Sequence, residues 1–261
     1  MKKGIFLSDI HLPDNISLKG IIDYVRDMRP DVIILGGDII DGEGLHASES
    51  MKAEDVKMSW FERDVELARN FIADLRKASP TAKVVYLEGN HEQRYARLQT
   101  KYPELFKKTL DFRGAMKPLV EQYIPYATAQ SYYRLGDTVF VHGDIFPDLH
   151  AKPYALRYSP LKVVYGHMHH FQAYTVHRAL MHQSNRYGVT AGCLSTLNPA
   201  WKRGQANQWV NGFVSFTFTA KVLIPTIHLM EHEVFSVGGK VYGGVGPKAR
   251  KEKPRDTRTG G

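Results

Sequence analysis

Five short apolar segments of this chain each run directly into a polar residue of a type that binds metal ions. The segments are GIFLS (4–8), DVIILGG (31–37), AKVVYLEG (82–89), TVFV (138–141) and KVVYG (162–166). The polar residues behind them are Asp9 and His11, Asp38, Asn90 and His91, His142, and His167 and His169. In layered α/β sheets ligands bind at the carboxyl ends of strands, whereas unrelated surface residues are scattered along all elements. The chain is therefore expected to bring five strand ends together at one site.

The first ninety residues alternate between strand and helix periodicity. Apolar residues recur at helical spacing in 17–28 and 53–78, and these stretches separate the segments at 4–8, 31–37 and 82–89. The segments are nearly continuous apolar runs, as expected for strands that are covered on both faces. This β-α-β-α-β order predicts an α/β fold with parallel strands in its first half.

The remainder of the chain has a different pattern. Residues 92–128 are mostly helical in spacing and rather polar, which favours a helical excursion over core. Beyond them, short β-branched and aromatic runs separated by Gly, Asp or Asn predict an antiparallel sheet with tight turns. We therefore expect an α/β (α+β layered) fold, a two-sheet β-sandwich flanked by helices, with first-half strands in one sheet and most second-half strands in the other. The expected boundaries are a domain at 1–236, a helical insertion at about 93–130, and a Gly/Pro-rich, basic, mobile tail at 237–261.

Composition excludes several classes of protein. A hydrophobic content of 43% and a charged content of 24% are those of an ordinary globular protein. The single cysteine, Cys193, excludes an intramolecular disulfide and any multi-cysteine metal site, so metal ligands must come from His, Asp, Glu or Asn. No stretch approaches the roughly 20 apolar residues of a membrane span. We expect a reducing, cytoplasmic location.

The net charge of +8 favours nucleic acid as a partner, because basic surfaces attract phosphate backbones. The distribution of charge weakens that inference. Residues 248–261 hold six Lys and Arg against two Asp and Glu, which is four of the eight excess charges. A solubilising end explains such a tail as well as a nucleic-acid arm does.

The residues behind the strands form a reasonable ligand set for two metal ions. Two divalent ions that lie close together need a bridging carboxylate to screen their repulsion, and Asp38 can supply it. Asp9, His11 and one further histidine can bind one ion, and Asn90, His142 and another histidine the other. Imidazole ligands suit Mn, Fe, Zn, Co or Ni better than Ca or Mg. Such a cationic site is expected to attract a phosphate group.

Five ordered motifs resemble those of calcineurin-like metallophosphoesterases. They are SDIH (8–11), GGDIID (36–41), GNHE (89–92), VHGD (141–144) and GHMH (166–169). The resemblance covers about the first two-thirds of the chain. The helical stretch between GNHE and VHGD, together with the late WVNGF at 209–213, looks most like uncharacterised phosphoesterases of bacteriophages and prophages. If the protein is encoded by a phage, the expected cytoplasm is that of the host.

The resemblance implies a role for each motif residue. The implied ligands of one metal are Asp9, His11 and His169, those of the other are Asn90, His142 and His167, and Asp38 bridges both. His91 is implied to face the scissile phosphate, where it stabilises the transition state or protonates the leaving oxygen. A water that bridges the two metals, Mn being the expected ion, is implied to be the nucleophile.

The substrate is expected to be a phosphodiester of a nucleotide or nucleic acid. Protein phosphatases of this superfamily hold a phosphomonoester with two motif arginines, and Gly42 and Glu88 stand at those positions here. Two alternatives stay open, a broad-specificity phosphomonoesterase and a non-catalytic scaffold with the same fold. Candidate substrate-binding residues, which offer cations and an aromatic ring, are Arg94, Trp201, Lys202 and Arg203. The oligomeric state is left open.

Four further residues near the motifs have less specific patterns. Asp41 and Asp144 follow predicted ligands closely and are expected either to orient imidazoles or to form turns. His170 has no motif position and is expected at the surface or behind a ligand. Trp209 is expected to pack in the core.

Overall fold

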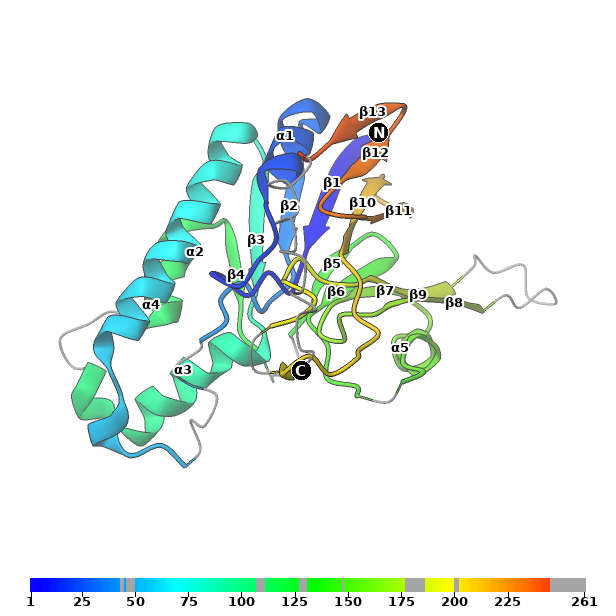
Figure 1. Ribbon diagram of the computed structural model, residues 1–261. Helices are drawn as coiled ribbons and strands as arrows, with labels where there is room; N and C mark the ends of the chain where they lie inside the picture. Colours follow the sequence, from blue (N-terminus) through cyan, green and yellow to red (C-terminus); the bar gives the residue numbers. More distant parts are fainter. Residues whose placement is uncertain are drawn as a thin grey trace, which may run out of the picture.

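The computed structural model describes residues 1–42, 45, 50–106, 111–126, 131–146, 148–176, 186–199 and 202–244. Within them, two β-sheets pack against each other and helices cover their outer faces (Figure 1). The expected two-sheet sandwich flanked by helices is therefore confirmed. In this part of the chain no helix is both long enough and apolar enough to cross a membrane.

The first sheet has six strands in the order β11-β10-β1-β2-β3-β4. These are β1 (Lys2–Leu7), β2 (Val32–Leu35), β3 (Lys83–Leu87), β4 (Gln122–Ile124), β10 (Gly212–Phe218) and β11 (Leu223–Leu229). Strands β1 to β4 run parallel, as the β-α-β-α-β pattern predicts, and β10 and β11 add antiparallel strands at the β1 edge. The carboxyl ends of β1, β2 and β3 therefore meet at one edge of the sheet.

Helices cover the outer face of this sheet (Figure 1). They are α1 (Lys19–Met28), α2 (Met58–Ala78), α3 (Asn90–Lys101) and α4 (Phe112–Met116), with short 3-10 turns η2 (Ala53–Asp55), η3 (Pro103–Phe106) and η4 (Lys117–Leu119). Helix α2 buries Phe61, Val65, Ala68 and Ile72, whose spacing of three or four residues places them on one face of the helix. This apolar stripe anchors α2 on the sheet.

The second sheet has five strands in the order β5-β6-β7-β9-β8. They are β5 (Tyr133–Leu135), β6 (Thr138–Val141), β7 (Lys162–Tyr165), β8 (Phe171–Val176) and β9 (Arg186–Ala191). The expectation of an antiparallel sheet is wrong for its centre, because β6, β7 and β9 run parallel. Helix α5 (Ala151–Arg157) carries the chain from the end of β6 to the start of β7, and parallel strands need such a crossover.

Two apolar layers bury both faces of the first sheet. Phe6 and Ile34 pack toward the second sheet, against Phe140 and Val164. The residues that alternate with them in β1 and β2 pack toward the helices. Since successive side chains of a strand point to opposite faces, burial on both sides explains the nearly continuous apolar runs.

The segment 92–128 belongs to the core, contrary to the expectation of a helical excursion. Tyr95, Leu98, Phe112 and Met116 are buried in the layer between the helices and the first sheet. The segment then ends in β4, which pairs with β3. In α3 the buried residues are Glu92, Tyr95 and Leu98, and the other polar residues of this helix are at least partly exposed.

The expected tail boundary at 237 is too early. Strands β12 (Phe235–Val237) and β13 (Lys240–Tyr242) form a hairpin that packs on α1, where the rings of Phe235 and Tyr242 lie 5.6 and 5.2 Å from the ring of Tyr24. Both rings are buried, so the hairpin is part of the domain. The predicted mobility of the basic tail concerns residues 245–261, which lie outside the described residues.

Candidate metal centre

The structure brings the seven predicted ligands and His91 together at the carboxyl ends of β1, β2, β3, β6 and β7. Parallel pairing within each sheet aligns these strand ends, and packing of the two sheets sets them side by side. The residues form two clusters with a shared carboxylate between them.

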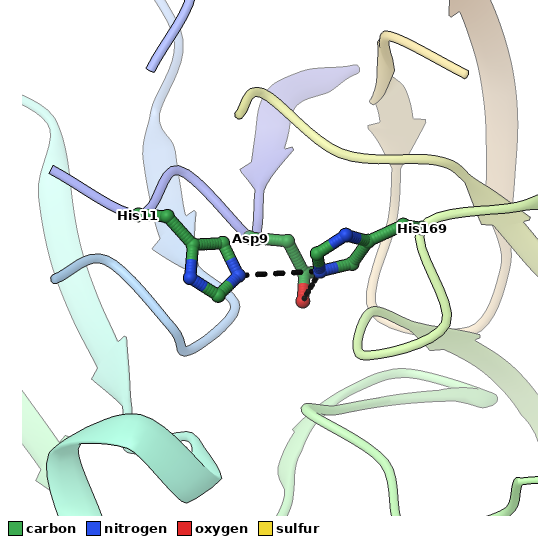
Figure 2. A group of neighbouring side chains, drawn as sticks. All are labelled: Asp9, His11 and His169. Carbon is green, nitrogen blue, oxygen red and sulfur yellow. Dashed lines mark hydrogen bonds and ion pairs between the residues drawn. The ribbon is translucent and has the colours of Figure 1, made fainter. Parts of the chain in front are cut away.

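The first cluster consists of Asp9, His11 and His169 (Figure 2). The Nε2 atoms of the two histidines lie 3.2 Å apart, and His169 Nε2 lies 3.3 Å from Asp9 Oδ1. Ligand atoms that surround one cation at about 2.1 Å lie about 3 Å from one another. The spacing within the first cluster therefore fits a bound cation.

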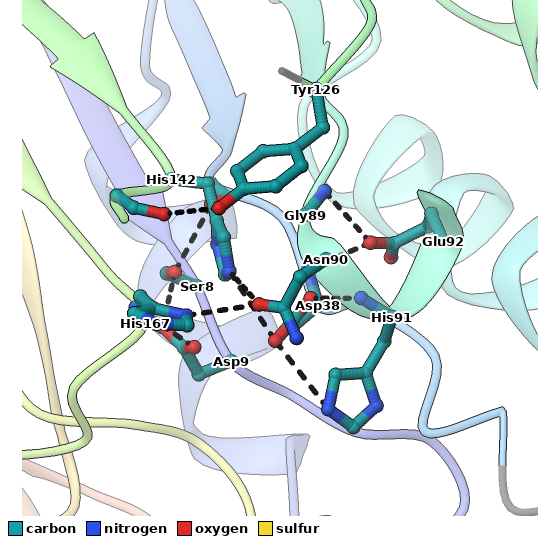
Figure 3. Close-up of polar contacts among 12 residues, drawn as sticks. Ser8, Asp9, Asp38, Gly89, Asn90, His91, Glu92, Tyr126, His142 and His167 are labelled. Atoms are coloured by element: carbon teal, nitrogen blue, oxygen red, sulfur yellow. Dashed lines mark hydrogen bonds and ion pairs between the residues drawn. The ribbon is translucent and has the colours of Figure 1, made fainter. Parts of the chain in front are cut away.

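The second cluster consists of Asp38, Asn90, His142 and His167 (Figure 3). Asn90 Oδ1 lies 3.0 Å from His142 Nε2 and 2.9 Å from His167 Nδ1. Asp38 Oδ2 lies 3.3 Å from His142 Nε2, and it is also 3.9 Å from His11 Nε2 in the first cluster. The Asp38 carboxylate thus lies between the clusters, a position that suits the predicted bridging role.

Hydrogen bonds set two histidines in the tautomer that a metal ligand needs. The carboxylate of Asp41 accepts a hydrogen bond from His11 Nδ1 at 3.0 Å, and the Gly36 carbonyl accepts one from His142 Nδ1 at 2.9 Å. Because the ring proton is held at Nδ1 in each neutral ring, the Nε2 lone pair faces the cluster. In His11 this lone pair points at another imidazole nitrogen, an arrangement that a cation stabilises. The donor set therefore fits two divalent ions.

Five of the predicted ligands have a left-handed backbone. The residues are Asp9 (φ 56°), His11 (54°), Asp38 (51°), His167 (74°) and His169 (58°). Nine non-glycine residues in the described part of the chain have positive φ, so more than half of them belong to this centre. Such conformations cost about 1 kcal/mol or more each, and they cluster at functional sites. The strained backbone is an independent sign that the fold is built around this centre.

The turn after Gly166 brings His167 and His169 to different clusters. A Cβ on Gly166 would lie 1.9 Å from Ser8 Oγ and 2.5 Å from Asp9 Oδ2, so no other residue fits without displacing Asp9. The backbone N–H of His167 donates to both carboxylate oxygens of Asp9, at 3.0 and 2.9 Å. Glycine is therefore a structural requirement of the GHMH motif.

Burial and charge act in opposite directions on the ionisable groups. Burial alone would raise the pKa of Asp38, but the charges of His142 and His91 hold it well below the usual value. Burial would lower the pKa of His142, yet Asp38 raises it to about 9. Burial lowers the pKa of His167 to about 4 and that of His91 to about 3. An ionised Asp38 and a neutral His167 are the forms that bind a cation, whereas His142 must release a proton to bind one.

His91 lies at the edge of the centre. Its backbone N–H donates to Asp38 Oδ1 at 2.9 Å, and its Nδ1 donates to the Asp41 carbonyl oxygen. The Nε2 edge therefore faces the centre, 3.8 Å from Asp38 Oδ2 (Figure 3). Asp144, by contrast, orients no ligand, because its exposed carboxylate pairs with Arg157 at 2.5 Å.

Glu92 supports the centre in a way that the sequence did not reveal. Its fully buried carboxylate accepts hydrogen bonds from the N–H groups of Asp38 (3.0 Å), Ile39 (2.7 Å) and Gly89 (2.8 Å) and from the Tyr86 hydroxyl (3.0 Å). Burial and the charge of Asp38 raise the pKa of Glu92 to about 7, while the N–H donors act against them. One carboxylate thus ties the loop that carries Asp38 to the start of α3.

Replacing Glu92 with Gln is expected to destabilise the fold by about 3 kcal/mol at pH 8.5, where the carboxylate is ionised. The amide keeps one acceptor oxygen but sets an NH₂ group against N–H donors. Urea unfolding followed by circular dichroism measures the change. The exposed Glu62→Gln, on α2, is the matched control and should stay within about 0.5 kcal/mol of the wild type. Equal stability of the two variants would show that the Glu92 carboxylate does not hold these loops.

A pocket of about 260 Å³ opens onto the two clusters. Besides cluster residues, its described lining contains Asp14, Asp41, His91, Arg94, Ser195, Thr196, Pro199 and Trp209. The guanidinium of Arg94 lies along His91, with nitrogens 3.0 and 3.2 Å from the two ring nitrogens. Arg94 is therefore placed to meet a ligand in the pocket.

The other proposed substrate-binding residues lie further out. The expectation that Trp209 packs in the core is wrong. Its half-buried ring lies 4.2 Å from the His169 ring and lines the pocket. Lys202 Nζ lies 3.9 Å from the centre of the Trp209 ring, and Arg203 beside it is exposed. Trp201 lies outside the described residues. The His170 ring lies 5.7 Å from the His150 ring, and His170 is not among the described residues that line the pocket.

Comparison with known proteins yields a family and a set of distant relatives. Residues 3–185 match a family model described as calcineurin-like phosphoesterase. The chain is 24% identical over 262 residues to the gene 54 protein of Mycobacterium phage L5, an alignment that covers 92% of this chain and 98% of the phage protein. Among solved structures, it is similar to Zn²⁺-complexed Vps29 from Entamoeba histolytica (13% identity, TM-score 0.42, covering 92% of this chain and 95% of Vps29). A conserved uncharacterised protein from Streptococcus pneumoniae is also similar (13% identity, TM-score 0.34, covering 90% of this chain and 86% of the other).

Proposed function

The chain belongs to the calcineurin-like phosphoesterase family, and from this premise we propose that it is a dinuclear metal-dependent phosphodiesterase that acts on nucleotides or nucleic acid. The observation that carries the proposal is the pair of donor clusters that share Asp38. Two divalent ions bound there would act as Lewis acids and supply a nucleophilic water near neutral pH. We propose Mn²⁺ as the ion, because imidazole and carboxylate ligands together suit it, and Fe, Zn, Ni and Co are the alternatives.

The chain's own residues have distinct tasks in this proposal. Asp9, His11 and His169 would hold one ion, Asn90, His142 and His167 would hold the other, and Asp38 would be shared between them. His91 presents its Nε2 edge to a phosphate that sits between the clusters; as the imidazolium, which the negative charge of a bound phosphate favours, it would stabilise or protonate the leaving oxygen. Arg94 provides a cation in the pocket wall for a phosphate oxygen.

The cationic groups at the site favour a diester over a monoester. At position 88, where protein phosphatases of the superfamily have an arginine, this chain has a buried glutamate. Its carboxylate forms a bidentate ion pair with Arg113 at 2.8 and 2.6 Å, so this position provides no positive charge for a substrate. Arg94 is the one arginine or lysine among the described residues that line the pocket. A diester carries one negative charge and a monoester two, so the diester needs less cationic support.

Hydrolysis of bis-p-nitrophenyl phosphate by the Mn²⁺-loaded protein is expected to exceed that of p-nitrophenyl phosphate by about 10-fold or more in kcat/KM. Arg94→Ala is expected to raise KM for the diester about 10-fold, since a charge-assisted hydrogen bond to the phosphate is lost. Steady-state kinetics measures both quantities. The exposed Arg69→Ala on α2 is the control and should match the wild type.

The outcomes of this assay separate the alternatives. Activity on the monoester alone would replace the proposal with a phosphomonoesterase, and no activity on either ester would favour a non-catalytic scaffold. The similarity to a mycobacteriophage protein supports a location in the cytoplasm of a host cell.

A further inference from the structure

Phe146 has an exposed aromatic ring that contacts His167 of the second cluster. It follows β6 by five residues and leaves 72% of its surface exposed. Its ring meets the His167 ring edge to face, with the centres 4.8 Å apart and the planes at 76°. Exposed phenylalanines are common singly, but this one contacts a residue of the metal centre and has an open face beside it.

Trp209 has the corresponding position at the first cluster. Its ring lies 4.2 Å from the His169 ring, and the Lys202 ammonium lies over it at 3.9 Å. Among the described residues, each histidine of the GHMH motif therefore contacts one phenylalanine or tryptophan ring, and the two histidines belong to different clusters. A phosphate that contacts both clusters has an aromatic ring next to each of them.

The pocket is small, and its described lining includes Trp209 but not Phe146. Its volume of about 260 Å³ is below the range of about 300–1,000 Å³ for sites that enclose drug-sized ligands. Since Phe146 is not part of this lining, it lies beyond the pocket wall on the His167 side. A substrate that touches both rings must extend out of the pocket past His167.

We propose that Phe146 and Trp209 each stack a base, one on either side of the scissile phosphate, and that the substrate is single-stranded nucleic acid. This inference rests on the phosphodiesterase function proposed above. Stacking on a protein ring needs a base whose face is free, which a strand offers and a base-paired duplex does not. Lys202, held above Trp209, is placed to meet a neighbouring phosphate of such a strand.

The experiment compares two diesters that differ only in their bases. One is the thymidine dinucleotide TpT, and the other is its analogue in which both bases are replaced by hydrogen. The wild type is expected to cleave TpT about 100-fold more efficiently, since each base–aromatic stack is worth about 10-fold. Phe146→Ala should lower kcat/KM for TpT about 10-fold, through KM, and change cleavage of the abasic diester less than 2-fold. Trp209→Ala should reduce the preference for TpT over the abasic diester about 10-fold, while Phe146→Tyr keeps the wild-type preference.

The exposed Leu149→Ala is the matched control for Phe146. It removes an apolar side chain from the same loop and should leave both rates unchanged. Equal losses on the two diesters in Phe146→Ala would overturn the inference, because they would show that the ring supports the centre instead of a base. Unchanged TpT cleavage in that variant would overturn it as well.

Binding separates failure of this inference from failure of the proposed function. If the wild type cleaves neither diester, the proposed phosphodiesterase function fails. The stacking inference is then tested by fluorescence anisotropy with labelled oligothymidylate, using the Mn²⁺-loaded protein. Binding that is weakened about 10-fold by Phe146→Ala and is not competed by duplex DNA supports stacking. Equal affinity for duplex and single strand would overturn it.

Discussion

Replacing Asp38 with Asn is expected to lower kcat/KM for bis-p-nitrophenyl phosphate by about 10³-fold, or about 4 kcal/mol. The variant should also lose one metal ion. Asp38 Oδ2 lies close to histidines of both clusters, and its negative charge offsets the repulsion between two cations. Asn keeps the acceptor oxygen for the His91 N–H and tolerates the left-handed backbone (φ 51°), so the fold should survive.

The control for Asp38→Asn is Asp144→Asn, since both changes remove one carboxylate charge near a motif. Asp144 is exposed and pairs with Arg157 away from the clusters, so this variant should retain full activity and metal content. Circular dichroism and thermal unfolding of both variants establish that they are folded. Wild-type activity in folded Asp38→Asn would exclude Asp38 as the bridging ligand.

Replacing His91 with Ala is expected to lower kcat by about 10²–10⁴-fold while metal content stays at the wild-type level. His91 lies beside the centre, with its Nε2 3.8 Å from Asp38 Oδ2 and near His11 and Asp41, and we assign it to the substrate instead of the metal ions. Its Nδ1 is fixed by the Asp41 carbonyl, which aims Nε2 at the centre. The expected defect is therefore in the chemical step and not in binding of metal.

His170→Ala is the matched control for His91, because it removes a half-buried imidazole that lies next to His150 and is not among the described residues that line the pocket. Stopped assays with a good and a poor leaving group sharpen the test. If His91 assists departure of the leaving oxygen, the loss should be larger for a dialkyl than for a bis-aryl diester. A loss of metal in His91→Ala, or equal activity of the two variants, would contradict the assigned role.

The clustering of ligands at the strand ends was predictable from sequence, because the carboxyl ends of parallel strands lie at the same edge of a sheet. Once 4–8, 31–37 and 82–89 are taken as parallel strands, Asp9, Asp38 and Asn90 must lie at one edge of the sheet. The assignment of His167 and His169 to separate clusters came from the resemblance alone. The structure adds the physical cause, a left-handed turn after a glycine whose Cβ would displace Asp9.

Other features depend on packing that local patterns do not encode. Apolar β-branched runs do not specify strand direction, so the parallel centre of the second sheet was predicted as antiparallel. Glu92 has the sequence of an ordinary carboxylate in the first turn of a helix, and only the approach of the Asp38 loop buries it. Trp209 was expected in the core because large aromatic rings usually are, yet it lines the pocket.

The central claim is that two clusters sharing Asp38 hold two divalent ions. Elemental analysis of the protein after loading with Mn²⁺ and removal of free metal tests this claim most directly. The account predicts about two ions per chain in the wild type and at most about one in Asp38→Asn, in step with the loss of diester hydrolysis. Fewer than two ions in an active wild-type protein, or two ions in the variant, would contradict it.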